Sequence, residues 1–181
     1  MLGDGCLHEA WPGTSKNYVF SKMHSIKQRE YLEWVHQKMQ PFTRNPIRLY
    51  EPTQSLRLRT IGHSTLTELR SKFYREGKKR LPADIRDILQ DSLALAVWFM
   101  DDGNAKRRGN IVEGYNLNTQ SFSKRENELL VHHFKNLYGI RACVEKNKGY
   151  YRIGIYSAES RNLFRGLFDW HILPSMQYKL G

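Results

Sequence analysis

The chain has 181 residues, 40% of them hydrophobic, and it contains four Trp, ten Tyr and eight Phe. This composition excludes a disordered chain, and the length suits one domain or two small domains with a packed core. No apolar run reaches the ~18 residues of a transmembrane helix. The formal net charge is +11, and Lys and Arg are spread along the chain. This distribution predicts a surface that binds a polyanion such as nucleic acid, with a merely soluble basic protein as the alternative.

The cysteine and histidine patterns exclude two further classes. Cys6 and Cys143 are the only cysteines, too few for a disulfide scaffold, so we expect a reducing compartment. The seven histidines show no spacing typical of a structural zinc site. No signal or transit segment is recognisable at Met1. A mitochondrion, a chloroplast and a bacterial cytoplasm all remain open as the location.

Two halves of the chain match each other in order. Residues 24–30 correspond to residues 120–126 at an offset of 96, and Asp4-Gly5 corresponds to Asp102-Gly103 at an offset of 98. Leu81-Pro82 corresponds to Leu173-Pro174 at an offset of 92. Small drifts of this kind arise from loop insertions between two copies. We therefore predict a tandem duplication, with a first repeat over 1–77, a linker and the start of a connecting helix over 78–91, and a second repeat over 92–181.

The first copy reads as an alternation of strands and helices. Apolar periodicity predicts strands over 17–25, 46–51 and 56–60 and a helix over 26–40. A second helix is expected from Ser64 or Thr65 to about Glu76, with Glu68 placed for a capping box. Residues 77–81 read as a linker to a helix that begins at Pro82, because proline favours the first helical position.

The second copy repeats this order after an apolar helix. Residues 93–100 are apolar on every side, so this helix should be buried all round, and Gly103 suits a left-handed position at its end. A strand is expected over 114–120, and a helix over 123–138 with a Ser123–Glu126 capping box and Gly139 as its stop. Strands over 142–146 and 150–156 form a hairpin, and a helix over 159–170 closes the copy.

Alternation along the strands places polar side chains on one face of each sheet. Leu56 and Leu58 alternate with Arg57 and Arg59, and Ile47 and Leu49 alternate with Arg48. Asn116, Asn118 and Gln120 likewise share one face of the strand expected over 114–120. Such Arg, Asn and Gln side chains suit bidentate contacts with base edges in the major groove, although an ordinary solvated sheet is the alternative. The residues predicted to contact DNA are Asn17, Arg44, Arg48, Arg57, Arg59, Lys106, Arg107, Arg108, Asn116, Asn118, Gln120, Lys146, Lys148 and Arg152.

The apolar helix ends in a carboxylate that is electrostatically unfavourable there. Asp102 faces the negative end of the helix dipole, at a cost of roughly 0.3–1 kcal/mol that a bound cation would offset. Asp4 occupies the equivalent place in the first copy. Two such acids, at the ends of two packed helices, predict a divalent-metal site whose oxygen ligands suit Mg²⁺. A solvated Asp at a helix end is the alternative.

Three segments carry a resemblance to a known family. Residues 98–103 (Trp-Phe-Met-Asp-Asp-Gly), 117–122 (Leu-Asn-Thr-Gln-Ser-Phe) and 173–180 (Leu-Pro-Ser-Met-Gln-Tyr-Lys-Leu) resemble the single-chain LAGLIDADG homing endonucleases, in the branch related to yeast mitochondrial intron endonucleases. The resemblance implies an α+β fold of two αββαββα repeats, with saddle-shaped antiparallel sheets on the DNA major groove and the motif helices at the central interface. It also implies a monomer that cleaves both strands of double-stranded DNA with Mg²⁺, leaving short 3′ overhangs.

The resemblance also assigns roles to individual residues. Asp4 and Asp102 match the metal-binding acids of the family, and Gly3 and Asp101 match positions whose backbone carbonyls help to hold the metal. Lys79 and Lys179 match the basic residues near each active site, where a lysine stabilises charge on the phosphate or tunes the attacking water. A plain phosphate contact is the alternative for Lys79, and Lys78 is a nearly equal candidate.

The sequence departs from the family at its beginning. The first motif helix should extend a turn or two before Met1, so we expect a fragment of a longer reading frame or a degenerate first copy. Two other functions on the same scaffold stay open. One is an intron maturase, which would bind intron RNA as a splicing cofactor, and the other is a catalytically silent DNA-binding protein.

Overall fold

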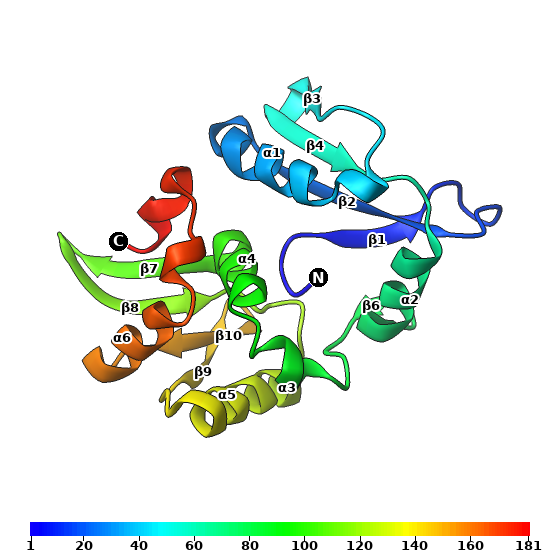
Figure 1. The fold of residues 1–181 in the computed structure, drawn as a ribbon. Helices are drawn as coiled ribbons and strands as arrows, with labels where there is room; N and C mark the ends of the chain where they lie inside the picture. The colour runs from blue at the N-terminus through cyan, green and yellow to red at the C-terminus, as the bar shows by residue number, and fades with distance from the viewer. The chain divides into compact units, whose positions relative to one another are not determined.

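The chain forms two compact units in the computed structural model, which describes residues 1–181: Met1–Glu76 and Gly77–Gly181 (Figure 1). Each unit contains a four-stranded antiparallel sheet, with the strand order β1-β2-β4-β3 in the first and β7-β8-β10-β9 in the second. The predicted α+β class is therefore confirmed. The shared strand order is what a duplication produces, while the repeat boundaries remain a prediction.

The first unit places two helices on its sheet. Helix α1 packs on β2 and β4, and helix α2 packs on β1 and β2. Its strands are β1 (Cys6–Glu9), β2 (Tyr18–Ser25), β3 (Arg48–Tyr50), β4 (Ser55–Arg59) and β5 (Tyr74–Arg75), its helices are α1 (Arg29–Lys38) and α2 (Ser64–Phe73), and its 3₁₀ turns are η1 (Ile26–Gln28), η2 (Gln40–Phe42) and η3 (Glu51–Thr53).

The core of this unit follows the alternation of β4. Leu56 and Leu58 are 2% and 0% exposed, whereas Arg57 and Arg59 between them are exposed. Leu32 of α1 and Leu66 of α2 are also buried. Burying each such leucine contributes about 1.5–3 kcal/mol, so the period-two pattern fixes which face of the sheet the helices cover.

Several boundaries in the first unit differ from the predictions. The cap of α2 is His63, whose Nδ1 accepts a hydrogen bond from the Thr65 amide at 3.2 Å, so the predicted Ser64/Thr65 cap is wrong. The predicted burial of Leu49 is also wrong, because β3 is a short edge strand whose three residues are all exposed. The predicted helix over 26–40 is divided between η1 and α1.

The second unit contains the longest helix of the chain, α5. Helix α5 packs on β9 and β10, and α4 contacts β7. Its strands are β6 (Lys78–Lys79), β7 (Gly103–Arg108), β8 (Ile111–Leu117), β9 (Cys143–Asn147) and β10 (Tyr150–Ile155), its helices are α3 (Ile85–Ile88), α4 (Ser92–Asp102), α5 (Lys124–Tyr138) and α6 (Ala158–Gly166), and its 3₁₀ turns are η4 (Asp169–His171) and η5 (Pro174–Lys179).

Aromatic side chains form the core of the second unit. Phe99 of α4 lies 5.1 Å from Phe168 and 5.9 Å from Phe164, measured between ring centroids. Trp98 stacks on Phe134 of α5 at 6.4 Å. Such pairs add about 0.5–1.5 kcal/mol beyond their burial, so α4 is fixed firmly relative to this sheet and α5.

The helix and turn boundaries predicted for the second unit are partly confirmed. Ser123 and Glu126 form the predicted capping box, and Gly139 ends α5 with φ +69°. The hairpin turn between β9 and β10 has positive φ at both Lys148 and Gly149, as a tight two-residue turn requires. The predicted helix start at Pro82 is wrong, because α3 begins at Ile85 with Asp84 at its N-cap.

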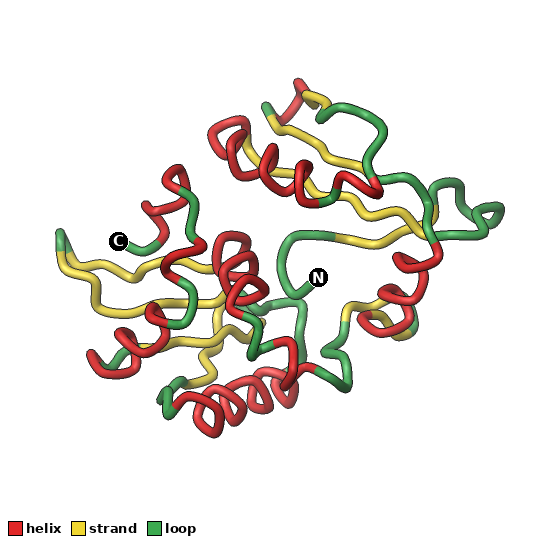
Figure 2. The backbone as a smooth tube through the Cα atoms, in the orientation of Figure 1, coloured by secondary structure: helices red, strands yellow, loops and turns green.

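The first five residues form no helix. Figure 2 shows this segment as a loop that leads into β1. Asp4 therefore precedes a strand, whereas Asp102 is the last residue of α4. None of the helices combines the length and apolar character needed to cross a membrane.

Candidate active site and nucleic-acid interface

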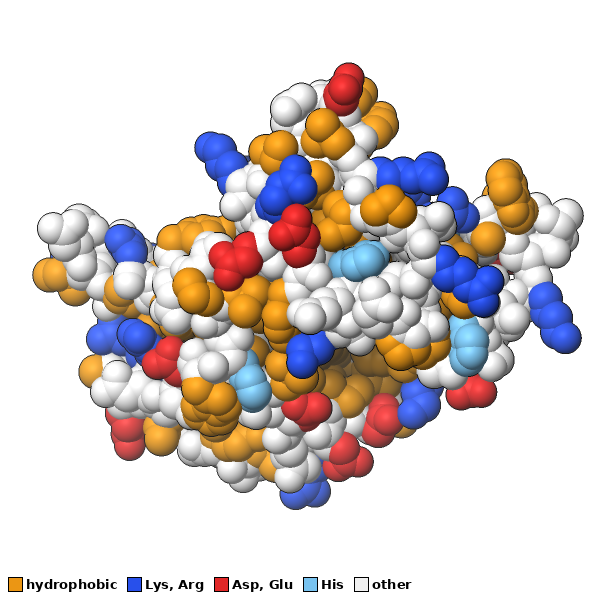
Figure 3. Space-filling model, turned by 45° about the horizontal axis from the view of Figure 1, so that its top comes forward, with side chains coloured by type: hydrophobic (Ala, Val, Ile, Leu, Met, Phe, Trp, Pro, Cys, Tyr) orange, Lys and Arg blue, Asp and Glu red, His pale blue; other side chains and the backbone are white.

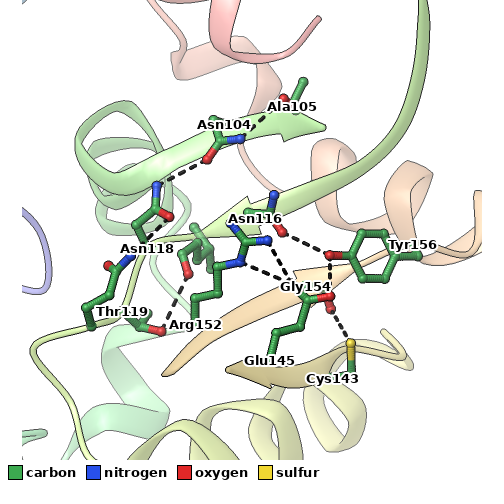
Figure 4. Close-up of polar contacts among 12 residues, drawn as sticks. Asn104, Ala105, Asn116, Asn118, Thr119, Cys143, Glu145, Arg152, Gly154 and Tyr156 are labelled. Carbon is green, nitrogen blue, oxygen red and sulfur yellow. Dashed lines mark hydrogen bonds and ion pairs between the residues drawn. The ribbon is translucent and has the colours of Figure 1, made fainter. Parts of the chain in front are cut away.

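Asn118 fixes the end of α4. Its backbone amide and its side-chain Nδ2 donate hydrogen bonds of 2.9 and 2.8 Å to the carbonyl oxygen of Asp102. The same Nδ2 donates to Asn104 Oδ1 on β7 at 3.1 Å (Figure 4). The last helical carbonyls have no partner inside a helix, so these bonds set the position of the Asp102 carboxylate relative to the sheet. Asn118 was predicted to contact DNA, and in the structure its amide holds α4 in place.

Lys179 approaches the same helix end from the C-terminal segment. Its Nζ donates a hydrogen bond of 2.7 Å to the Asp101 carbonyl oxygen. Tyr115 Oη donates to the Leu180 carbonyl at 3.1 Å, and Leu180 is 2% exposed, so the end of the chain is held against the core. A cation at the negative end of a helix offsets the dipole cost of the two carboxylates. The structure thus brings together three of the predicted site residues, Asp101, Asp102 and Lys179.

Gly103 is required by space and not by its backbone angles. Its φ of −80° and ψ of 151° are extended, so the predicted left-handed conformation is wrong. A Cβ at this position would lie 2.2 Å from Cδ2 of Phe99 and 2.5 Å from the Phe99 carbonyl oxygen. A Cβ at Gly5, in the equivalent place of the first unit, would lie 2.3 Å from Cε2 of Phe20. In both units, the glycine lets the chain turn past an aromatic ring directly after the acid.

Asp4 lies beside a buried histidine in the first unit. The Asp4 side chain is 45% exposed, and its Oδ2 lies 3.9 Å from Nε2 of His24. The other ring nitrogen, Nδ1, lies 2.9 Å from Oε1 of Gln28. Gly3, assigned a carbonyl role by resemblance, is buried just before this carboxylate. Neither the composition nor the spacing of residues in the sequence indicated that His24 lies beside Asp4.

Lys79 is half-buried in β6, and Lys78 beside it is exposed. A lysine that acts on a reacting phosphate must keep its ammonium in a defined place, whereas a lysine that only attracts the phosphate backbone does not. Burial therefore favours Lys79 over Lys78 for the catalytic role.

The exposed face of the first sheet carries three arginines. Arg48 of β3 is directly opposite Arg57 of β4, and Arg59 follows on the same face. Like charges at directly opposed positions destabilise a sheet, and a bound polyanion relieves that repulsion. The three arginines line a cavity of about 410 Å³ beside Trp11, and the guanidinium of Arg59 donates to the Ala10 carbonyl at 3.0 Å.

Two other predicted contacts lie off the strands of the first unit. Asn17 precedes β2 and is half-buried, and its Oδ1 accepts a hydrogen bond from Thr67 Oγ1 at 3.2 Å. It therefore ties the start of β2 to α2, and its contact with DNA stays a prediction. Arg44 is exposed in the segment between η2 and β3.

The corresponding face of the second sheet holds a polar network centred on Tyr156. Its hydroxyl donates to Glu145 Oε1 at 2.6 Å and lies 3.1 Å from Asn116 Oδ1, and Lys106 Nζ lies 4.8 Å from the ring centroid. Arg152 pairs with Glu145 at 3.0 Å (Figure 4). Burial is the largest cause of a pKa of Tyr156 well above its usual range, and the hydrogen bond to Glu145 is the second largest cause. The hydroxyl therefore remains a donor.

Several predicted contacts of the second unit lie elsewhere. Asn116 is only 3% exposed and lies within hydrogen-bond distance of the Tyr156 hydroxyl, and its direct contact with DNA stays a prediction. Lys146 alternates with Glu145 and lies opposite Tyr151, on the other side of the sheet. Arg107 follows the bulge in β7, and its guanidinium lies 3.5 Å from where a Cβ at Gly181 would be, close to the end of the chain. Gln120 is half-buried and donates to Asn118 Oδ1 at 3.5 Å.

The remaining basic residues of the second unit are exposed. Lys106 and Arg108 are exposed on β7, and Lys148 is exposed at the tip of the β9–β10 hairpin. On the face drawn in Figure 3, Lys and Arg side chains lie in several separate places and not in one block. Glu145 and Tyr156 were missed from the sequence, although the alternation that places Arg152 on this face also places Glu145 opposite it.

The donors at the end of α4 suit a hard divalent cation. The Asp102 carboxylate and the Asp101 carbonyl offer oxygen atoms only, which Mg²⁺, Mn²⁺ and Ca²⁺ accept. In the first unit, Asp4 offers a carboxylate and His24 a nitrogen.

Comparison with known proteins gives consistent matches over most of the chain. The model of the LAGLIDADG DNA endonuclease family matches residues 1–163. The chain is 28% identical to a probable intron-encoded endonuclease of Wickerhamomyces canadensis, over 99% of this chain and 80% of that protein. It is 32% identical to the cytochrome b mRNA maturase bI2 of Debaryomyces hansenii, over 70% of this chain but only 46% of the maturase.

Solved structures agree with these matches. The homing endonuclease I-WcaI bound to its DNA recognition sequence superposes with a TM-score of 0.83 at 25% identity, covering 99% of this chain and 81% of that one. At 14% identity the fold alone is shared with I-DmoI, solved with DNA and manganese, with a TM-score of 0.55 and coverage of 92% and 89%.

Proposed function

This chain belongs to the LAGLIDADG DNA endonuclease family, and on that premise we propose that it cleaves both strands of DNA at a long recognition site with Mg²⁺ as its metal. The reaction is hydrolysis of phosphodiester bonds, and double-stranded DNA is the partner. The observation that carries the proposal is the end of α4, where Asp102, the Asp101 carbonyl and Lys179 meet.

The residues at that helix end have separate roles in the proposed reaction. Asn118 holds the Asp102 carbonyl by two hydrogen bonds, so the adjoining carboxylate has a defined direction. Lys179 carries a positive charge to the position where a scissile phosphate gains negative charge, which lowers the barrier to attack. A bound divalent ion supplies activation of water and stabilisation of the leaving 3′ oxygen. In the first unit, Asp4 takes the corresponding role, and Lys79 of the second unit is the other basic residue that we propose for catalysis.

Affinity for DNA comes from the exposed faces of the two sheets. Arg48, Arg57 and Arg59 carry the positive charge of the first face. On the second face, Lys106 and Arg152 are held by the Tyr156 network, so they meet DNA in defined positions. Fixed guanidinium groups discriminate between base edges better than mobile ones, because less side-chain entropy is lost on binding.

A maturase is the second candidate function. The 32% identity to a cytochrome b mRNA maturase favours it, because RNA binding can use the same basic surfaces. Deletion of this coding sequence separates the two functions: loss of splicing of a surrounding intron supports a maturase, and unaffected splicing supports the endonuclease alone.

The decisive experiment is a cleavage selection from a randomised DNA library with Mg²⁺, followed by the Asp102→Asn variant on the selected site. We expect wild-type cleavage, and a loss of at least 100-fold in Asp102→Asn with DNA affinity within about tenfold. Asp84→Asn, at the N-cap of α3, is the control for removing a carboxylate elsewhere. Unchanged cleavage by Asp102→Asn would reject the assignment of Asp102.

A further inference from the structure

We propose that His24 is a metal ligand in the first unit, where its Nε2 and the Asp4 carboxylate together bind a divalent ion. This inference rests on the proposed function, and it assigns a ligand that neither the family resemblance nor the composition supplies. It implies that the two metal sites of the enzyme differ in chemistry, with a nitrogen ligand beside Asp4 and oxygen ligands alone beside Asp102.

The distance between the two donor atoms supports a shared ion. Asp4 Oδ2 and His24 Nε2 are 3.9 Å apart. Two donors bound at right angles to one ion, each at about 2.1 Å, are about 3 Å apart. The Asp4 side chain is 45% exposed and lies in a loop, so a small rotation closes the difference, while the side chain of His24 is 4% exposed and stays fixed.

Gln28 prepares the histidine for this role. Its Oε1 can only accept a hydrogen bond, so the 2.9 Å contact places the imidazole proton on Nδ1. The lone pair then lies on Nε2, the nitrogen that faces Asp4. Metal-binding histidines typically have their second nitrogen held in this way. Tyr31 packs edge-on against the ring at 5.1 Å and keeps its plane in place.

The second unit has a different residue at this position. At the repeat offset of 96, Gln120 corresponds to His24. The Gln120 amide donates to Asn118 Oδ1 at 3.5 Å, and an amide nitrogen is not a metal ligand. The duplication has therefore left an imidazole in one unit only. Imidazole favours Co²⁺, Ni²⁺ and Zn²⁺ over Mg²⁺, so these ions should bind more tightly beside Asp4 than beside Asp102.

Pulsed electron paramagnetic resonance of Mn²⁺ tests the ligand directly. The full chain is bound to the cleaved duplex that its own reaction produces, with Mn²⁺ added, and nitrogen coupling to the manganese is measured. We expect ¹⁴N coupling in the wild-type complex, and its replacement by ¹⁵N coupling when the protein is labelled with ¹⁵N-histidine. In His24→Gln, which introduces the residue of the second unit, the histidine coupling should disappear.

A matched control is His36→Gln in α1, because His36 Nε2 contacts the Asn45 carbonyl and not Asp4, so this substitution should leave the coupling unchanged. Isothermal titration with Co²⁺, on a Cys6→Ser background to exclude the exposed thiol that lines the same cavity as Asp4, should show at least tenfold weaker binding in His24→Gln at one site.

The outcomes separate this inference from the proposed function. Wild-type complex that holds Mn²⁺ without histidine coupling would overturn the His24 assignment, even if His24→Gln proved unstable. If the wild-type protein cleaves no DNA in Mg²⁺, the proposed endonuclease function is contradicted instead. That cleavage assay makes no assumption about whether His24 binds the metal.

Discussion

The Lys179 ammonium donates a 2.7 Å hydrogen bond to the Asp101 carbonyl, one residue from the carboxylate that ends α4. This contact joins the last turn of η5 to the last turn of α4, although 78 residues separate them. It gives the lysine a fixed position at the centre of the proposed chemistry. It also means that an ion coordinated by the Asp101 carbonyl would have the ammonium as a neighbour.

Replacing Lys179 tests this arrangement. Lys179→Met keeps the length of the side chain but removes its charge, so cleavage in Mg²⁺ should fall about 100- to 1000-fold. DNA affinity should fall less than tenfold, because one phosphate contact among many is lost. Single-turnover cleavage and equilibrium binding on the selected site measure the two effects. Lys135→Met on α5 is the control, and equal losses in both variants would contradict the role of Lys179.

Gly103→Ala tests the close approach behind Asp102. An added Cβ would lie 2.2 Å from the Phe99 ring, and Phe99 is fully buried among other aromatic rings. Overpacking of this kind should lower the free energy of unfolding by about 1–3 kcal/mol. Gly166→Ala in α6 has open space around its Cβ and should stabilise by up to about 1 kcal/mol. Urea unfolding of both variants measures the two free energies of unfolding. Similar values would contradict the prediction, because they would show that the Phe99 ring moves aside at little energetic cost.

Glu126 should make stability depend on pH. Burial raises its pKa, but the hydrogen bonds from Ser123 and the Leu81 amide and the charge of Arg80 outweigh this, so the net pKa is lowered from 4.5. A depressed pKa in the folded state contributes stability above about pH 4.5, and the contribution is lost as pH falls through the folded value.

In Glu126→Gln the free energy of unfolding should be lower at pH 7, and its decline below about pH 4.5 should be shallower than in the wild type. Urea unfolding at a series of pH values measures both quantities. Glu128→Gln is the control, because Glu128 is 54% exposed in an ordinary helical pair with Lys124. A variant with the wild-type pH profile would contradict the assignment.

Glu145→Gln should alter the selectivity for DNA. The carboxylate accepts the Tyr156 hydroxyl and holds Arg152 by two nitrogens, so the amide releases the guanidinium from one defined position. We expect affinity to rise or stay constant because a negative charge is removed, while discrimination at one or two base pairs falls about 10-fold. A cleavage selection with both proteins measures this. Glu113→Gln, which removes the partner of Arg108, is the control, and an unchanged base preference in Glu145→Gln would refute the positioning role.

The sequence predicted the elements whose signals are local. The Ser123–Glu126 box, the Gly139 stop and the alternation of β4 are confirmed, because each depends on residues a few positions apart. The left-handed Gly103 was wrong because the space required beside Phe99, and not the helix end, selects glycine there. Asn116 and His24 could not be placed, because their partners Tyr156 and Asp4 lie 40 and 20 positions away and are brought close only by strand pairing.

The ring of Tyr156 leaves no room beneath it. A Cβ at Gly114 would lie 2.3 Å from the ring, and one at Gly154 would lie 2.7 Å from it. During evolution toward a new target sequence, Gly114 and Gly154 therefore cannot be replaced by a residue with a side chain while Tyr156 is present. A change of specificity requires substitutions at the surrounding residues, such as Lys106 and Arg152, or a prior substitution of Tyr156 itself. Libraries built to redirect the second unit should leave both glycines unchanged unless position 156 is varied with them.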